Sequence, residues 1–222
     1  LKKMNSQILT KIYNFIKYRL IELSGFLLVI VSVFLFLSII TYSGGQDNFI
    51  YRTENSEIDY ANFGGFYGSA IADFLLQSIG LIVFLVILNL CFWGFKLINK
   101  KKVANFISKI FFTLAYIIFG TTFINIFNNS SFWLIQNGNS GFVGRMVKEN
   151  IYSFTTLIEN QYTIYSLILL TIVFFVLSLD IKINEIIKIF LFPFEVIKKI
   201  INFIKRNKKE IDANKDISNI QL

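Results

Sequence analysis

The 222-residue chain is 55% hydrophobic, has a mean hydropathy of +0.60 and carries a formal net charge of +8. Its apolar residues are pooled into long runs, whereas soluble domains disperse them at helix or strand period, so an ordinary soluble domain is excluded. The absence of histidine and the single cysteine, Cys91, exclude imidazole chemistry and a disulfide within the chain. With several apolar runs, the positive charge indicates lysines on cytoplasmic loops rather than nucleic-acid binding.

Residues 1–22 form a basic segment in which Ile8, Ile12 and Phe15 recur at helical spacing. Two interpretations are open, a short helix resting on an anionic membrane surface and a partly ordered, solvated tail. Residues 23–42 are uncharged and have the length of roughly 20 residues that a bilayer requires. We predict the first spanning helix over these residues.

Residues 43–80 are predicted to form the first non-cytoplasmic connection. Its first part carries four carboxylates: Asp47, Glu54, Glu57 and Asp59. Their spacing does not match a compact calcium-binding loop, so we interpret this part as a solvated acidic loop.

The end of this connection has a different pattern. Gly65 and Gly68 supply a backbone that turns freely. Three polar residues then recur every fourth position on one side of a predicted helix: Ser69, Asp73 and Gln77. After Gly80 this stripe stops, and residues 81–97 are almost wholly apolar. We expect a helix at the membrane surface that leads into a second spanning helix over 81–97.

Two asparagines lie within predicted spanning helices. Asn89 is near the middle of the second helix, and Asn125 lies towards the far end of the third, which is predicted over 110–127 after a short basic connection. An amide that faced lipid would be costly, so we expect both side chains to form hydrogen bonds between helices.

Residues 128–162 form the second predicted non-cytoplasmic loop, and the fourth spanning helix follows over 163–179. From Gly141 onward the apolar residues of this loop return at helical spacing, which predicts another surface-lying helix. Each half of the chain thus has a loop, an amphipathic helix and a spanning helix in that order, which hints at an internal repeat. The basic residues 181–206 are predicted to form an amphipathic helix on the cytoplasmic leaflet, and the polar residues 207–222 begin a linker.

The distribution of basic residues sets the predicted orientation. If both termini and the central connection are cytoplasmic, that side holds 19 of the 22 Lys and Arg residues. The other side holds three: Arg52, Arg145 and Lys148. The positive-inside rule therefore predicts cytoplasmic termini and four crossings. The expected fold is all-α, a polytopic membrane protein with a four-helix transmembrane domain over 23–180 plus surface-lying amphipathic helices.

The pattern G-x-x-G-x-x-I-A-D-x-x-L-Q-x-x-G-L between Gly65 and Leu81 resembles the amino-terminal four-helix membrane region of the FtsK/SpoIIIE DNA translocases. The resemblance implies a membrane anchor at the bacterial division septum that serves chromosome segregation and cell division. It also implies a homo-hexamer, contacts with septal proteins, and DNA contact only through a cytoplasmic ATPase further along the chain. The candidate partner-contact or structural residues are Gly65, Gly68, Asp73, Gln77 and Gly80.

An enzyme within this stretch has little support. The chain has no G-x-x-x-x-G-K-[ST] phosphate loop and no charge at the centre of a predicted span. We therefore expect no catalytic, cofactor or metal site here, with ATP and Mg²⁺ only in a downstream motor. Two alternatives remain open: a stand-alone membrane scaffold, or a small polytopic transporter subunit with Asn89, Asn125 and Cys91 lining its cavity.

Overall fold

The computed structural model describes residues 2–44, 62–100, 102–131, 134, 136–155, 160–181 and 198. The chain divides into two compact units, Leu1–Asp180 and Ile181–Leu222, and all the helices below belong to the first. The four carboxylates of the predicted acidic loop lie outside the described residues. So does nearly all of the predicted amphipathic helix over 181–206, and all of the linker over 207–222.

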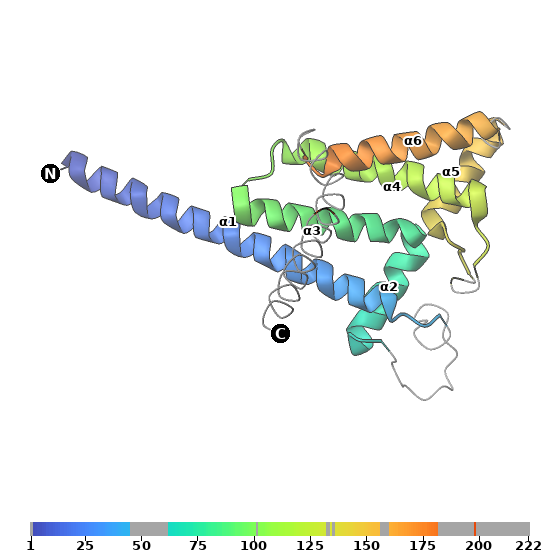
Figure 1. The fold of residues 1–222 in the computed structure, drawn as a ribbon, viewed down its shortest axis with the longest axis horizontal. Helices are drawn as coiled ribbons and strands as arrows, with labels where there is room; N and C mark the ends of the chain where they lie inside the picture. The colour runs from blue at the N-terminus through green and yellow to red at the C-terminus, as the bar shows by residue number, and fades with distance from the viewer. Residues whose placement is uncertain are drawn as a thin grey trace, which may run out of the picture. The chain divides into compact units, whose positions relative to one another are not determined.

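Among the described residues, every regular element is helical (Figure 1). In chain order they are α1 (Lys2–Ile40), α2 (Gly65–Ile79), the 3-10 turn η1 (Gly80–Ile82), α3 (Val83–Lys100), α4 (Phe106–Asn128), α5 (Gly141–Phe154) and α6 (Gln161–Ser178). Four stretches are long and apolar enough to cross a membrane: Thr10–Ile40, Gly65–Asn99, Phe106–Asn128 and Gln161–Ser178. The prediction of an all-α protein with four transmembrane helices is therefore confirmed.

The first helix differs from its predicted bounds, because α1 passes through residue 22 without a break. Arg19 and Glu22 form an ion pair of 2.8 Å one turn apart, and the Ser24 hydroxyl donates to the Ile21 carbonyl at 2.7 Å. Both contacts join residues that are three apart within a continuous helix. No proline or glycine occurs in the chain before Gly25 that could break it. The basic segment and the first span are thus one helix.

The helices pack as two hairpins. In the first, α3 runs back along α1; in the second, α6 runs back along α4 (Figure 1). The first pair crosses at Gly25 and Gly94, where a Cβ on Gly25 would lie 2.8 Å from the Gly94 carbonyl oxygen. Helices in a bilayer gain little from apolar burial against each other, so small residues that allow close backbone contact hold this crossing.

The two short helices join these hairpins. α2 packs against α1, α5 packs against α4, and α2 and α5 also contact each other. Both begin with a glycine at positive φ, Gly65 at +57° and Gly141 at +67°, within the sequence Gly-Phe-x-Gly. The second glycines, Gly68 and Gly144, sit where a Cβ would press on Ser38 of α1 and on Thr121 of α4. This correspondence supports the internal repeat at the level of individual contacts.

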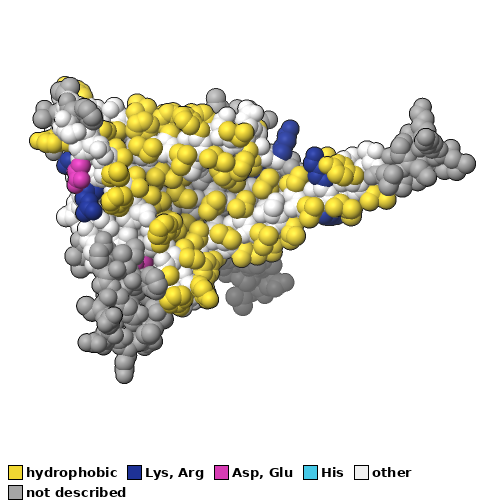
Figure 2. Space-filling model, turned by 180° about the vertical axis from the view of Figure 1, so that it is seen from behind, with side chains coloured by type: hydrophobic (Ala, Val, Ile, Leu, Met, Phe, Trp, Pro, Cys, Tyr) yellow, Lys and Arg dark blue, Asp and Glu magenta, His cyan; other side chains and the backbone are white. Residues whose placement is uncertain are grey.

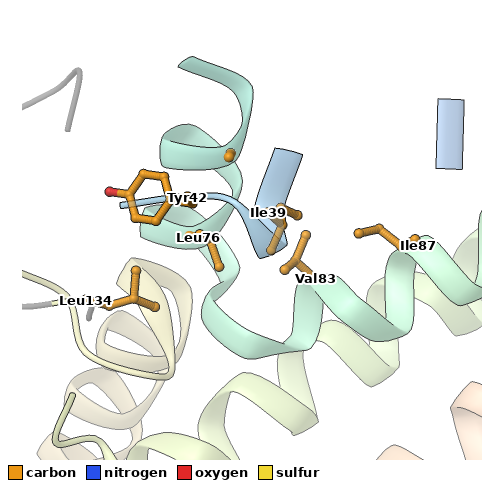
Figure 3. Packing of buried hydrophobic residues seen from close by; sticks show 7 residues of the cluster. Ile39, Tyr42, Leu76, Val83, Ile87 and Leu134 are labelled. Atoms are coloured by element: carbon orange, nitrogen blue, oxygen red, sulfur yellow. The ribbon is translucent and has the colours of Figure 1, made fainter. Parts of the chain in front are cut away.

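A buried apolar cluster lies where α1 ends and α3 begins. It comprises Ile39, Tyr42, Ala72, Leu76, Val83, Ile87 and Leu134. Ile39 and Val83 point toward each other from the two long helices, with Leu76 of α2 beside them (Figure 3). Elsewhere the long helices expose apolar side chains, which cover much of the surface seen in Figure 2. A bilayer rather than water is the solvent that suits such a surface.

Candidate functional site

The polar stripe of α2 is turned into the protein. Asp73 has no exposed surface and Gln77 is also buried. The Tyr42 hydroxyl donates to Asp73 Oδ1 at 2.6 Å, and the Asn137 amide donates to Gln77 Oε1 at 2.8 Å. Gln77 Nε2 is a further, longer donor to Asp73 Oδ1 at 3.4 Å. We call Tyr42, Asp73, Gln77 and Asn137 the Asp73 network. It ties the end of α1 to α2 and to the loop before α5.

Backbone contacts reinforce this junction. Gly80 has a φ of +56°, and a Cβ there would overlap the Asn139 carbonyl. The Leu81 amide donates to that same carbonyl at 2.9 Å. The end of α2 and the start of α5 therefore meet main chain to main chain, which only glycine allows at this position.

Asn89 of α3 joins three helices. Its amide nitrogen donates to Ser178 Oγ at 2.8 Å and to Thr113 Oγ1 at 3.0 Å, which links α3 to α6 and α4. Asn125 has a different position, because its amide donates at 2.8 Å to Ser140, just before α5. The half-buried Cys91 lies on α3.

At the opposite end of α3, the residues around Asp180 form a charged cluster. Asp180 follows α6 with a φ of +55°, and its carboxylate lies 2.8 Å from Lys96 Nζ and 3.3 Å from Lys109 Nζ. The Ala104 amide also donates to it at 3.2 Å. Burial alone would raise the pKa of Asp180, but the hydrogen bonds from Lys96, Ala104 and Lys109 outweigh it and hold that pKa below its usual range.

We call Lys96, Ala104, Lys109 and Asp180 the Asp180 cluster. Lys96 also donates to the Asp180 carbonyl, and Lys109 donates to the Leu177 carbonyl at 2.7 Å. Carbonyls at a helix C-terminus lack partners within the helix and favour nearby cations. The cluster therefore caps α6 and ties its carboxyl end to α3 and α4.

Among the described residues, no group of three or more His, Cys, Asp or Glu side chains is placed to hold a metal ion. The polar contacts join one helix to another at both ends of the bundle and, through Asn89, between those ends.

A comparison with known protein families matches residues 17–191 to the 4TM region of the DNA translocase FtsK/SpoIIIE. The match covers more than three quarters of the chain, and its four helices agree with the four spans of the structure. The chain belongs to this family. Comparisons with curated proteins and with solved structures find no match.

In this FtsK/SpoIIIE membrane region, the five residues considered for partner contact occupy different surroundings. Asp73 and Gln77 are in the Asp73 network, and Gly80 contacts the loop before α5. Gly68 faces Ser38 and Asn62, whereas a Cβ on Gly65 would meet open space.

The outward side of α2 and the turn before it is apolar in this FtsK/SpoIIIE region. Its exposed large side chains are Phe63, Phe66, Tyr67, Ile71 and Phe74. The first two aromatics of α2 escaped notice in the sequence, although their helical spacing from Ile71 and Phe74 carries the signal. Any partner or lipid that approaches α2 from outside meets these rings rather than the polar stripe.

Proposed function

We propose that this chain is the membrane anchor of a septal DNA translocase, and that it targets the motor to the division site for chromosome segregation and cell division. The observation that carries the proposal is the family match over residues 17–191, together with four candidate spans in the same region. In this proposal the anchor itself is not a motor. ATP, Mg²⁺ and DNA are handled by a domain that follows residue 222.

The Asp180 cluster supports an anchoring role. A motor that pulls on DNA also pulls on the chain that tethers it, and here the chain towards the motor continues from Asp180, two residues after the end of α6. Its carboxylate and carbonyl are held by lysines from two other helices, α3 and α4. Tension on the carboxyl end of α6 is thereby shared with α3 and α4, and it does not act on α6 alone.

The proposal includes cytoplasmic termini at the bacterial inner membrane, a homo-hexamer and contacts with septal proteins. The exposed aromatic side of α2 is the surface that we assign to these contacts or to surrounding lipid. A transporter has no comparable support, because the Asn89 amide bonds Ser178 and Thr113 within the bundle.

Two measurements test the proposal. In dividing bacteria, residues 1–222 fused to a fluorescent protein should gather at the septum, whereas an unrelated four-helix membrane protein with the same fusion should remain evenly distributed. The open reading frame should continue past residue 222 through a polar linker to a G-x-x-x-x-G-K-[ST] domain. Even fluorescence around the membrane would refute septal targeting, and a stop codon near residue 222 would refute the translocase assignment.

A further inference from the structure

An open pocket of about 310 Å³ lies between the end of α4 and one side of α5. Its lining residues are Asn125, Asn129, Arg145, Lys148, Glu149 and Tyr152. Arg145, Lys148 and Tyr152 share one side of α5, since they are three, four and seven residues apart. We call this the α5 pocket. In Figure 2, basic and acidic side chains gather at one end of the molecule.

Internal hydrogen bonds hold the α4 wall of this pocket. Asn125 donates to Ser140 Oγ at 2.8 Å, and Asn129 Oδ1 accepts from the Ser140 backbone amide at 3.0 Å. Gly144 of α5 packs so closely on Thr121 of α4 that a Cβ would lie 2.5 Å from the Thr121 carbonyl oxygen. The two walls are thus fixed relative to each other before any ligand binds, which reduces the ordering cost of binding.

The charge of the pocket is unusual for its side of the bundle. By the predicted orientation that side holds three basic residues, and two of them, Arg145 and Lys148, line this one pocket. Among the described residues Arg145 forms no ion pair, and its guanidinium lies 5.9 Å from the centre of the Phe142 ring. Glu149 stands exposed at the rim. Arg145 thus carries a positive charge on the side that the positive-inside rule leaves poor in basic residues, and an anionic group is its electrostatic complement.

The depth of the pocket indicates what that counterpart is. The candidate span of α4 ends at Asn128, between the lining residues Asn125 and Asn129. With this apolar run placed in the hydrocarbon, the pocket lies at the level of the headgroup phosphates, where hydrocarbon gives way to water. Next to the pocket, α5 exposes Phe142 and Met146, two apolar side chains suited to contact acyl chains.

We propose that the α5 pocket binds the phosphate group of an anionic lipid headgroup. The Arg145 guanidinium offers two parallel N–H donors to two phosphate oxygens, and Lys148 adds a compact positive charge. The Tyr152 hydroxyl is a further donor at the rim. A zwitterionic lipid is disfavoured because its cationic group would approach both basic side chains. This proposal rests on the orientation included in the proposed function, but not on septal targeting, since it concerns lipid chemistry alone.

Native mass spectrometry of the full chain in detergent tests the proposal, with phosphatidylglycerol and phosphatidylcholine as probes. We expect phosphatidylglycerol to be retained preferentially, and Arg145→Gln/Lys148→Gln to weaken its retention about tenfold, as the loss of two charge-assisted contacts implies. Lys101→Gln/Lys102→Gln removes two charges from the connection between α3 and α4 and should change retention less than about twofold.

Further variants keep the result interpretable if the double variant folds poorly. Arg145→Lys preserves the charge but removes the two parallel N–H donors of the guanidinium, so it should give an intermediate loss of lipid retention. Thermal unfolding of each variant shows whether it is folded. Soluble glycerol phosphate distinguishes a free phosphate ester from a lipid headgroup as the source of the phosphate. Displacement of the lipid would support a phosphate site that is open to free phosphate esters. No displacement would support a site for the intact lipid. Equal losses in both double variants, or no preference for phosphatidylglycerol, would overturn the proposal.

Discussion

The two ends of this helical bundle are joined by different chemistry. At one end, the Asp180 cluster sets a carboxylate between two ammonium groups, whereas at the other the Asp73 network surrounds a buried carboxylate with hydroxyl and amide donors. Opposite charges attract over several ångströms and are weakened by salt and acid, while hydrogen bonds from uncharged groups depend on short distances and alignment. The contacts at the Asp180 end should therefore weaken with added salt or acid. Those at the Asp73 end should weaken with substitutions that change the packing.

The largest expected effect is at the Asp73 end. Gly80→Ala introduces a Cβ that overlaps the Asn139 carbonyl at a residue with positive φ, so we expect a loss of roughly 2–4 kcal/mol in the free energy of unfolding. Gly65→Ala is the matched control, because its φ is also positive but its Cβ would meet open space, and it should cost only about 1–2 kcal/mol. Thermal unfolding in detergent measures both, and equal losses would argue against close packing at Gly80.

The next effect concerns the Asp73 network itself. Asp73→Ala leaves the buried Tyr42 hydroxyl without its acceptor, and we expect a cost of about 2–3 kcal/mol. Tyr42→Phe should cost about 1–2 kcal/mol alone and much less in the Asp73→Ala background, since the two side chains share one bond. A double-mutant cycle of unfolding free energies gives the coupling. Additive losses would mean that this hydrogen bond contributes nothing.

At the Asp180 end we expect Asp180→Asn to lower the free energy of unfolding by about 1–2 kcal/mol. The substitution removes the charge, and asparagine still tolerates the positive φ of this residue. Because the folded-state pKa of Asp180 is lowered, its contribution is complete above the ordinary aspartate pKa of about 3.9. That contribution declines as the pH falls through the lower, folded-state value. The stability difference between wild type and Asp180→Asn should therefore shrink on acidification below about pH 4. A difference that is constant with pH would exclude the ionic contribution.

The smallest effect lies between the two ends. Asn89→Ala removes donors to Ser178 and Thr113, and hydrogen bonds between membrane helices contribute on average about 0.6 kcal/mol. We expect a loss of about 1 kcal/mol, measured by unfolding in mixed micelles, with Cys91→Ala on the same helix as a comparison. A loss above about 3 kcal/mol would make Asn89, rather than the Asp73 network or the Asp180 cluster, the main polar junction of the bundle.

The number of spans followed from sequence because the length of an uncharged run decides whether a helix crosses a bilayer. The start of α1 does not follow in this way, because the uncharged run begins after residue 22 whereas the helix continues through the charged residues before it. Helical period also identified Asp73 and Gln77 as neighbours on one side of α2. The helical period does not show which part of the protein covers that side. In the structure it is covered by the end of α1 and by the loop before α5.

The Asp180 cluster was missed for another reason. Lys96, Lys109 and Asp180 are far apart in the chain, and each alone has the ordinary pattern of a charge at the end of a membrane helix. Only the packing of α3, α4 and α6 brings them together. A basic residue at the end of one span and an acidic residue directly after another are the sequence signal that suggests such a pairing.

The length of α1 gives the crossing at Gly25 and Gly94 a mechanical consequence. At a rise of about 1.5 Å per residue, the 39 residues of α1 extend for roughly 58 Å, about twice the hydrocarbon thickness of a bilayer. Gly25 divides this rod into arms of about 35 Å toward Lys2 and about 22 Å toward Ile40. The arm toward Ile40 is held by the buried cluster that contains Ile39, so a bend at the glycine contact moves the amino-terminal arm. A tilt of about 10° there would move the amino-terminal tip by about 6 Å.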